Sequence, residues 1–280
     1  MKVSVIIPMY NEEKVIENCL VSLSEQTYKD MEVIIVDDES LDNSKFKVEK
    51  LRLKIQNLKL LQQKHKGPGE ARNSGAKNAT GEILVFVDAD MTFEKDFIKE
   101  LVTPIINGKT KGTFSKDEYV SNLTNIWSQC WGINEGWEKG KRHTENYPNT
   151  QKVFRAILKS EFDRVNGFEG GGHYTDDWSL SDKLGYGATV APGAKFYHEN
   201  PQSLGEVFKQ AKWVGKREYK LGEFGKLLAL IRVSLPMSLF VGLVKSLLHI
   251  IPQFLIFKII YDLGVFLGIL EYMILGKGAK

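Results

Sequence analysis

The stretch Ile83–Asp90, with the sequence ILVFVDAD, decides the fold of this chain of 280 residues. Its first five residues are apolar and rich in β-branched side chains, which is typical of a buried strand. Two carboxylates follow, those of Asp88 and Asp90. Because alternate residues of an extended chain point to the same side, both carboxylates can reach one hard divalent cation at the carboxyl end of the strand. The alternative role for such a pair is to cap backbone N–H groups in the turn that follows.

A second apolar run also ends in carboxylates. Residues 32–36 (EVIIV) lead into Asp37 and Asp38, and apolar runs at residues 3–7 and 58–62 complete a set of four. Their spacing of about 25 to 30 residues is typical of parallel strands that alternate with crossover helices. In such an open sheet the carboxyl ends of the strands line one crevice, where ligands bind. The pattern therefore predicts a Rossmann-like, nucleotide-binding α/β domain with a mostly parallel central sheet.

The segments between these runs predict helices. Apolar residues recur at helical spacing after Asn11, a second helix is expected from about Ser44, and a third from Pro68. Proline suits the first turn of a helix. The small residues Ala71 and Gly75 allow the third helix to pack closely on the sheet.

The composition is that of a globular protein. Hydrophobic residues make up 42% of the chain and charged residues 26%, so a packed core is expected and disorder is not. Cys19 and Cys130 match no metal or redox spacing, and we expect buried thiols in a reducing compartment. The first residues are typical of a strand and not of a signal peptide.

The net charge of +3 conceals an uneven distribution. Residues 205–280 carry 11 Lys and Arg against 5 Asp and Glu, whereas residues 1–204 have a slight acidic excess. A basic and apolar tail favours an anionic lipid surface as partner. Nucleic acid is not expected, because the aromatic residues are not interleaved with Lys and Arg as stacking platforms would require.

Four short motifs, in a fixed order, carry a family resemblance. They lie at residues 5–13 (VIIPMYNEE), 36–40 (VDDES), 67–75 (GPGEARNSG) and 88–90 (DAD). Together they resemble the signature of family 2 glycosyltransferases, and the similarity continues at residues 166–169, at residues 175–180 and at His198. The resemblance implies the GT-A fold, a nucleotide-sugar donor, a divalent metal ion and inversion at the anomeric carbon.

The resemblance also implies a domain organisation. One GT-A domain is expected over residues 1–220, with a nucleotide-binding half at 1–105 and an acceptor-binding half at 106–220. Residues 221–280 are expected to form membrane-associated helices.

Seven residues are implied to bind the nucleotide sugar: Pro8, Tyr10, Glu12, Asp38, Arg72, Asp88 and Ala89. The loop after the first strand would border the base and ribose, Asp38 would accept a hydrogen bond from the base, and Arg72 would lie over the base and phosphate. The alternatives are an ordinary strand-to-helix turn, helix capping and a solvated arginine.

The metal site follows from the same resemblance. Asp90 is implied as the direct ligand, with Asp88 nearer the ribose and His198 as a third ligand. Mn²⁺ or Mg²⁺ is the expected cofactor, acting as a Lewis acid on the departing diphosphate. Imidazole suits Mn²⁺ better than Mg²⁺. The alternative for His198 is a structural histidine.

Asp177 matches the family's catalytic base, which takes a proton from the acceptor hydroxyl. Asp176 stands beside it, where the family usually has Glu. Two adjacent carboxylates oppose each other's ionisation, which raises a pKa toward the useful range. A helix start is the alternative and compatible role. Residues 170–173 (GGGH) are expected to form a flexible lip.

Four further residues are implied on the acceptor or diphosphate side: Arg155, Lys212, Trp213 and Arg217. The last three resemble a family element in which Arg is frequent at the position of Lys212. An amphipathic basic helix at the membrane surface is the alternative for that segment.

Two apolar stretches near the end, residues 227–244 and 254–275, are long enough to span a hydrocarbon core. Pro236, Pro252 and Gly264 are expected to break them. Lys258 and Asp262 are costly at a bilayer centre and are predicted to pair at their i,i+4 spacing. A membrane hairpin and helices lying in the interface both fit. A soluble dimer interface is the alternative, and self-association through these helices fits either case.

The sequence thus predicts a metal-dependent inverting glycosyltransferase at the cytoplasmic side of the cell membrane. A UDP-sugar is the favoured donor, and the acceptor is lipid-linked or a glycan. One alternative is a nucleotidyltransferase, which would need a glycine-rich phosphate loop that residues 8–11 do not form. The other is a non-catalytic, membrane-associated scaffold that binds a nucleotide sugar.

Overall fold

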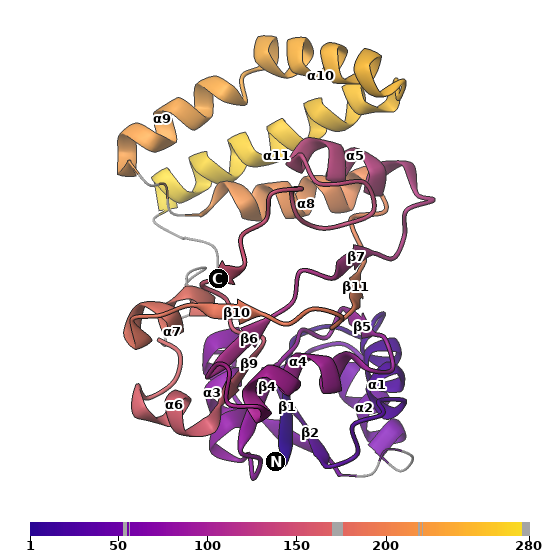
Figure 1. Cartoon of the computed structure of the whole chain (residues 1–280). Helices are drawn as coiled ribbons and strands as arrows, with labels where there is room; N and C mark the ends of the chain where they lie inside the picture. The colour runs from indigo at the N-terminus through magenta and orange to yellow at the C-terminus, as the bar shows by residue number, and fades with distance from the viewer. Residues whose placement is uncertain (53–54, 56, 170–175, 218, 220, 276–280) are drawn as a thin grey trace. The chain divides into compact units, whose positions relative to one another are not determined.

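The computed structural model describes residues 1–52, 55, 57–169, 176–217, 219 and 221–275 (Figure 1). The chain forms two compact units. The sheet unit contains residues 1–119 and 146–198, and the helical unit contains residues 120–145 and 199–280. The predicted domain boundary near residue 220 stays a prediction, although residues 199–220 group with the helical unit.

The sheet unit is built on the four predicted strands. They are β1 (Val3–Met9), β2 (Met31–Asp37), β3 (Leu58–Gln62) and β4 (Ile83–Phe86), and they pair in parallel in the order β3-β2-β1-β4. Val5 lies opposite Val33 on one side and Val85 on the other. Buried residues run through β1, β2 and β4 because both faces of this part of the sheet are covered, whereas in the edge strand β3 Leu58 is buried and the residues after it are partly or fully exposed.

Beyond β4 the sheet becomes mixed. The antiparallel strand β9 (Ala156–Leu158) pairs with β4 and connects to the remaining three strands of the eight. These are β6 (Gly112–Phe114), β10 (Ala188–Val190) and β8 (Thr150–Gln151). A separate three-stranded sheet has the order β5 (Met91–Phe93), β11 (Phe196–His198) and β7 (Glu118–Val120). The sequence analysis predicted neither the reversal at β9 nor this small sheet.

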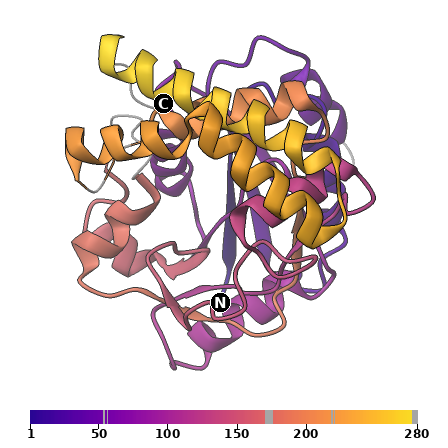
Figure 2. The ribbon, with the colours of Figure 1, turned by 90° about the horizontal axis from the view of Figure 1, so that it is seen from above.

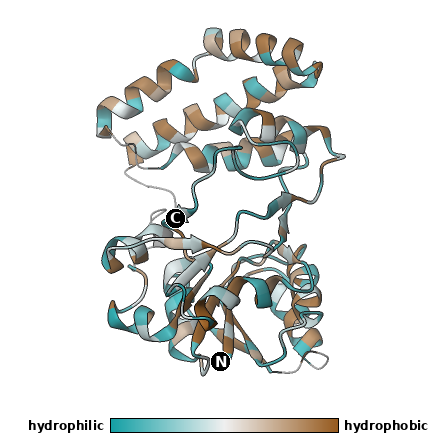
Figure 3. Cartoon of the chain, in the orientation of Figure 1, coloured by the Kyte–Doolittle hydropathy of each residue, from teal (hydrophilic) through white to brown (hydrophobic). Residues whose placement is uncertain are grey.

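Helices cover both faces of the large sheet. One core contains buried residues of α1 (Ile16–Ser24), α2 (Ser44–Arg52) and α4 (Phe97–Ile106). The other contains buried residues of α3 (Pro68–Lys77), α6 (Lys159–Arg164) and α7 (Asp176–Leu184). Hydrophobic residues dominate the strands between these two layers (Figure 3).

Two of the predicted helix starts, Ser44 and Pro68, are confirmed. The first helix begins at Ile16 and not at Asn11, because Asn11 adopts a left-handed conformation with a φ of 57°. Gly75 provides the predicted close packing of α3 on the sheet. A Cβ atom there would lie 2.5 Å from Cγ2 of Ile6. Cys19 and Cys130 are buried free thiols, as predicted.

Within the described residues, the helical unit contains five helices. They are α5 (Ile126–Glu135), α8 (Leu204–Gly215), α9 (Gly222–Arg232), α10 (Leu235–His249) and α11 (Gln253–Leu275). Helix α11 packs against both α8 and α10 (Figure 2). By length and composition, α11 is the one described helix that could cross a membrane by itself. The α9–α10 pair passes the same test only as a span bent by 59°.

The predicted break at Gly264 is wrong, because α11 continues through it. Gly264 instead lets α8 approach closely, since a Cβ atom there would lie 2.7 Å from the carbonyl oxygen of Phe208. The breaks near Pro236 and Pro252 are confirmed, because Pro236 lies in the first turn of α10, which begins at Leu235, and Pro252 lies between α10 and α11.

The predicted pair inside α11 is also confirmed. Lys258 Nζ lies 2.8 Å from the carboxylate of Asp262. Ser238 Oγ of α10 donates a second hydrogen bond to this carboxylate at 2.7 Å. The Asp262 carboxylate is therefore satisfied within the helical unit, although it is almost fully buried.

Candidate functional site

The carboxylate of Asp88 lies between two arginines in the sheet unit. Arg72 of α3 donates to Oδ1 at 2.7 Å, and Arg155, which precedes β9, donates to Oδ2 at 3.2 Å. Burial disfavours the charged form of Asp88, but the attraction of Arg155 and Arg72 outweighs it and holds the pKa of Asp88 below its usual range. Asp88 is therefore ionised, and it brings two guanidinium groups to the end of β4.

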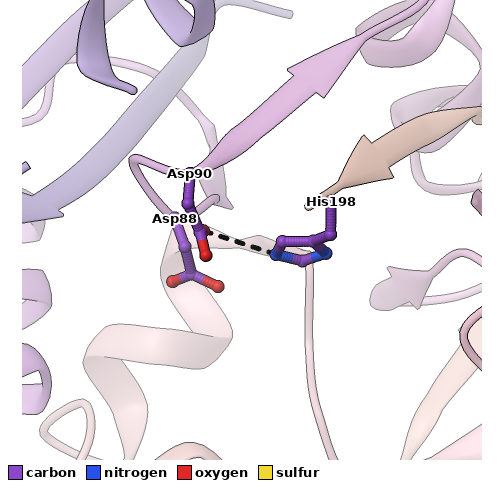
Figure 4. A group of neighbouring side chains, drawn as sticks. All are labelled: Asp88, Asp90 and His198. Carbon is purple, nitrogen blue, oxygen red and sulfur yellow. Dashed lines mark ion pairs between the residues drawn. The ribbon is translucent and has the colours of Figure 1, made fainter. Parts of the chain in front are cut away.

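Asp90 and His198 lie beside Asp88 (Figure 4). His198 Nε2 is 3.4 Å from Asp90 Oδ1. Each of the three residues offers one ligand atom, and these atoms lie within 4.8 Å of one another. The strand ends of β4 and β11 thus bring together residues that are more than a hundred positions apart in the sequence.

Glu118 of β7 orients this histidine. Its Oε1 lies 2.6 Å from His198 Nδ1. A hydrogen bond from Nδ1–H to the carboxylate leaves the lone pair of Nε2 directed at Asp90, which is the arrangement that most metal-binding histidines adopt. Two aspartates and one oriented imidazole form a donor set that fits a divalent cation, Mn²⁺ in particular.

Glu12 adds a third carboxylate to the same neighbourhood. Burial raises its pKa to about 7, and the negative charges of Asp90, Asp88 and Asp42 contribute in the same direction. Its backbone N–H donates to Ser44 Oγ at 2.7 Å, which fixes the loop after β1. The raised pKa comes first from burial and then from these carboxylates, so a cation bound nearby would favour the ionised form of Glu12.

Asp38, at the end of β2, shapes the loop that leads into α3. Its carboxylate is buried and accepts hydrogen bonds from the backbone N–H groups of Lys66 at 2.9 Å and Gly67 at 2.8 Å. The side chains of Gln63 and His65 also lie within 3.0 Å of it. Its predicted contact with a nucleotide base stays a prediction, and in the structure it orders the loop before Arg72.

Tyr10 and His65 form an exposed aromatic pair. Their ring centroids are 4.3 Å apart, and 41% of Tyr10 is exposed. The sequence analysis named Tyr10 but missed His65 and Glu118. His65 follows the predicted strand at residues 58–62, so its place at a strand's carboxyl end is a signal that could have identified it. Glu118 lies in a segment without any such signal.

The other predicted donor-site residues lie nearby. Pro8 is in β1, opposite Val36. Ala89, which separates the two aspartates in the sequence, is buried. Arg155 was predicted on the acceptor or diphosphate side, and the structure places its guanidinium on Asp88. The functional roles of these residues stay predictions.

Lys212, Trp213 and Arg217 belong to the helical unit. Lys212 Nζ lies 2.6 Å from Glu271 of α11, and Lys216 binds the other oxygen of the same carboxylate at 2.7 Å. The guanidinium of Arg217 lies 5.1 Å from the ring centroid of Trp213. In the structure the two lysines therefore hold α8 to α11, and Arg217 packs on Trp213.

The predicted base and lip lie largely outside the described residues. Asp176 and Asp177 begin α7, in agreement with the predicted helix start. Their side chains, and the whole of residues 170–173, are not among the described parts of the chain.

Comparisons with known proteins match this arrangement. The family model described as "Glycosyl transferase family 2" matches residues 4–169. The poly(ribitol-phosphate) beta-N-acetylglucosaminyltransferase TarS of Staphylococcus aureus is 44% identical over 104 residues, which are 36% of this chain and 18% of that protein. The poly(ribitol-phosphate) beta-glucosyltransferase of Bacillus spizizenii is 38% identical over 123 residues, 40% of this chain and 19% of that protein. The chain thus spans less than a fifth of the length of these relatives.

Solved structures share the fold at low sequence identity. Residues 1–349 of S. aureus TarS in complex with UDP-GlcNAc match with a TM-score of 0.60 at 20% identity, over 99% of this chain and 93% of that one. The mannosyltransferase PcManGT from Pyrobaculum calidifontis, in complex with GDP-Man and Mn²⁺, matches with a TM-score of 0.61 at 20% identity, over 99% and 88%. The predicted GT-A type of α/β fold is therefore confirmed.

Proposed function

The chain belongs to glycosyl transferase family 2, and we propose that it transfers a sugar from a UDP-sugar to a lipid-linked or glycan acceptor with inversion at the anomeric carbon. The observation that carries the proposal is the cluster of Asp88, Asp90 and the Glu118-oriented His198 at the carboxyl ends of two strands. Matching structures in complex with UDP-GlcNAc and with GDP-Man and Mn²⁺ support the donor class.

Asp90 and His198 would hold the cation, with Asp88 beside them. A bound Mn²⁺ or Mg²⁺ would supply positive charge to offset the diphosphate that leaves the sugar. Asp90 is the more accessible carboxylate, because 47% of its side chain is exposed and both oxygens of Asp88 already contact arginines. This difference favours Asp90 as the direct ligand.

Arg72 and Arg155 would prepare the site for an anionic donor. Asp88 holds both guanidinium groups in place through ion pairs, and Arg72 is almost fully buried. A guanidinium that is already oriented loses little freedom when it binds phosphate. Asp177 is proposed as the base that takes the proton from the acceptor hydroxyl, with Asp176 beside it.

Membrane association is proposed from the surface of α9 and α10. Large apolar side chains on these helices are at least half exposed: Phe224, Leu227, Ile231, Leu235, Phe240, Leu243, Leu247, Leu248 and Ile250, at the end of α10. They form long hydrophobic stretches on both helices (Figure 3). An exposed apolar surface of this extent is typical of a protein or membrane interface. We propose the cytoplasmic face of a membrane, where a lipid-linked acceptor would be within reach.

A binding and turnover experiment tests the proposal. We expect UDP-sugars with Mn²⁺, among a panel of UDP-, GDP-, CDP- and dTDP-sugars, to raise the melting temperature of the protein. Asp90→Asn should abolish the Mn²⁺-dependent part of this increase. Asp177→Asn should keep the increase but lose transfer of radiolabelled sugar to membrane lipids.

Asp30→Asn, an exposed change in a turn, is the matched control and should behave as the wild type. Absence of stabilisation by any nucleotide sugar would contradict the donor proposal. Transfer activity that persists in Asp177→Asn would contradict the assignment of the base, and label that enters only soluble glycans would contradict a lipid acceptor.

A further inference from the structure

The helical unit contains a cavity of about 1020 Å³ that is lined by none of the residues assigned above to sugar transfer. Its walls come from α5, from residues 136–141 and from the C-terminal end of α10. Most of its lining surface consists of apolar atoms, and Leu123, Ile133, Trp137 and Ile251 contribute apolar side chains. This volume is at the upper end of the range for small-molecule sites, and the lining suits a hydrocarbon chain.

Positive charge gathers in the same cavity. Lys139, Lys141 and Lys245 line it, and Glu138, the one carboxylate among the described lining residues, pairs with Lys141 at 3.0 Å. Lys245 is held in place, because its Nζ donates to the carbonyl oxygen of Ile133 at 2.8 Å. An apolar cavity with an excess of fixed cations suits a ligand that has an apolar body and an anionic head.

Asn200 lies in the wall of the cavity. It is 3% exposed, and its Nδ2 donates to the carbonyl oxygen of Ser128 at 3.2 Å. Asn200 therefore ties this part of the wall to α5.

The cavity shares a wall with the exposed apolar surface of α10. His249 and Ile251 line the cavity, whereas Leu247, Leu248 and Ile250 are 79%, 73% and 88% exposed. The chain segment that would enter a bilayer thus also forms part of the cavity.

We propose that this cavity binds the hydrocarbon chain of a membrane lipid with a phosphate headgroup. The chain lies along the apolar lining, and the phosphate is bound by the cations that include Lys245. Free fatty acids and inorganic phosphate share parts of this chemistry, but neither matches both the large apolar volume and the adjoining membrane surface. The binding does not depend on sugar transfer, so it can be tested by itself.

Gly132 offers a specific way to fill the cavity. It lies in α5 and lines the cavity, and a Cβ atom added to it would meet no atom within 4 Å. Gly132→Leu should therefore place a side chain in the empty volume without a clash. The change should also keep or raise the melting temperature, because leucine is a better helix former than glycine. Gly205→Leu, at an exposed position in the first turn of α8, is the matched control.

The assay measures binding of 11-(dansylamino)undecanoic acid, a fluorescent amphiphile, to the full chain, with dodecyl phosphate as competitor. We expect dodecyl phosphate to displace the probe. Gly132→Leu should weaken probe binding about tenfold or more, which corresponds to losing the burial of roughly one apolar group of the probe. Gly205→Leu should stay within about twofold of the wild type. Lys245→Met should weaken competition by dodecyl phosphate and leave competition by dodecanol unchanged.

Several outcomes would overturn the proposal. Unchanged probe binding in Gly132→Leu would place the amphiphile on the exposed helix surface and not in the cavity. Dodecanol competing as well as dodecyl phosphate would exclude recognition of the headgroup. Displacement by inorganic phosphate alone would assign the site to free phosphate, and stronger competition by dodecanoate than by dodecyl phosphate would assign it to fatty acids.

Discussion

Replacement of Glu32 by glutamine should remove a large and pH-dependent part of the stability of the sheet unit. Glu32 lies in β2 and is 2% exposed. Its carboxylate accepts hydrogen bonds from Ser4 Oγ of β1, from Lys59 Nζ of β3 and from both the N–H and the hydroxyl of Thr80, each at 2.7 Å. One side chain thus joins three adjacent strands and the turn before β4.

The lowered pKa of Glu32 gives the magnitude of the expected loss of stability. Burial opposes ionisation, but the hydrogen bonds from Lys59, Thr80 and Ser4 outweigh it and lower the pKa from 4.5 to about 2. This difference corresponds to about 3 kcal/mol of folding free energy. Because the folded-state pKa is the lower one, the contribution is complete above pH 4.5 and is lost as the pH falls toward 2. It should be about 3 kcal/mol at pH 7 and about 2 kcal/mol at pH 3.5.

Urea denaturation of the wild type and of Glu32→Gln at both pH values measures this effect. We expect the difference in unfolding free energy to be largest at pH 7 and to shrink at pH 3.5. Glu49→Gln is the control, since Glu49 is 47% exposed and lies 3.6 Å from Arg52, so its loss should cost less than about 0.5 kcal/mol. A loss below about 1 kcal/mol at pH 7, or an equal loss at both pH values, would refute the reasoning.

Three further predictions concern the metal cluster, the core and the membrane surface. Glu118→Gln should weaken Mn²⁺ binding about tenfold or more in calorimetry, because His198 loses the partner that orients it, and unchanged affinity would exclude this role. Gly75→Ala should destabilise the protein by about 1 to 2 kcal/mol in urea denaturation because it collides with Ile6, whereas the same change at Gly132 should stabilise it by up to about 1 kcal/mol. If both substitutions destabilise the protein, or both stabilise it, the packing argument is contradicted. Glutamine at both Leu247 and Leu248 should lower binding to anionic vesicles about tenfold or more in sedimentation, and unaltered binding would remove α10 from the membrane contact.

The central part of the fold could be predicted because its signals are local. Three of the four parallel strands, β1, β2 and β4, are largely apolar runs buried on both faces, so their sequences alone identify them, and β3 was expected from its apolar residues and its spacing. The position of Asp88 and Asp90 at the end of β4 follows in the same way. Strands of two or three residues, such as β8 and β11, carry too few residues for a pattern, and their pairing partners lie far away in the sequence.

The residues of the candidate site likewise divide into those that a local motif identified and those that it did not. The motif resemblance identified Asp88, Asp90, Arg72 and His198, and the structure brings all four to the end of β4 and its neighbours. For Arg155 the resemblance implied a contact with the acceptor or the diphosphate, whereas in the structure this residue contacts the carboxylate of Asp88. Glu118 was missed, because a carboxylate that only orients another ligand leaves no trace in a local pattern.

Local sequence patterns identified the parallel strands, the aspartates at the ends of β2 and β4 and the apolar character of the last 60 residues, since periodicity and composition act over a few neighbouring positions. The folded structure was needed to show that Glu118 fixes His198, that Gly264 packs α8 against α11 instead of ending a helix, and that α5 and α10 enclose a cavity. Each of these depends on side chains from distant parts of the chain meeting at distances of a few ångströms. The folding of the backbone brings such groups together, and local sequence patterns do not record it.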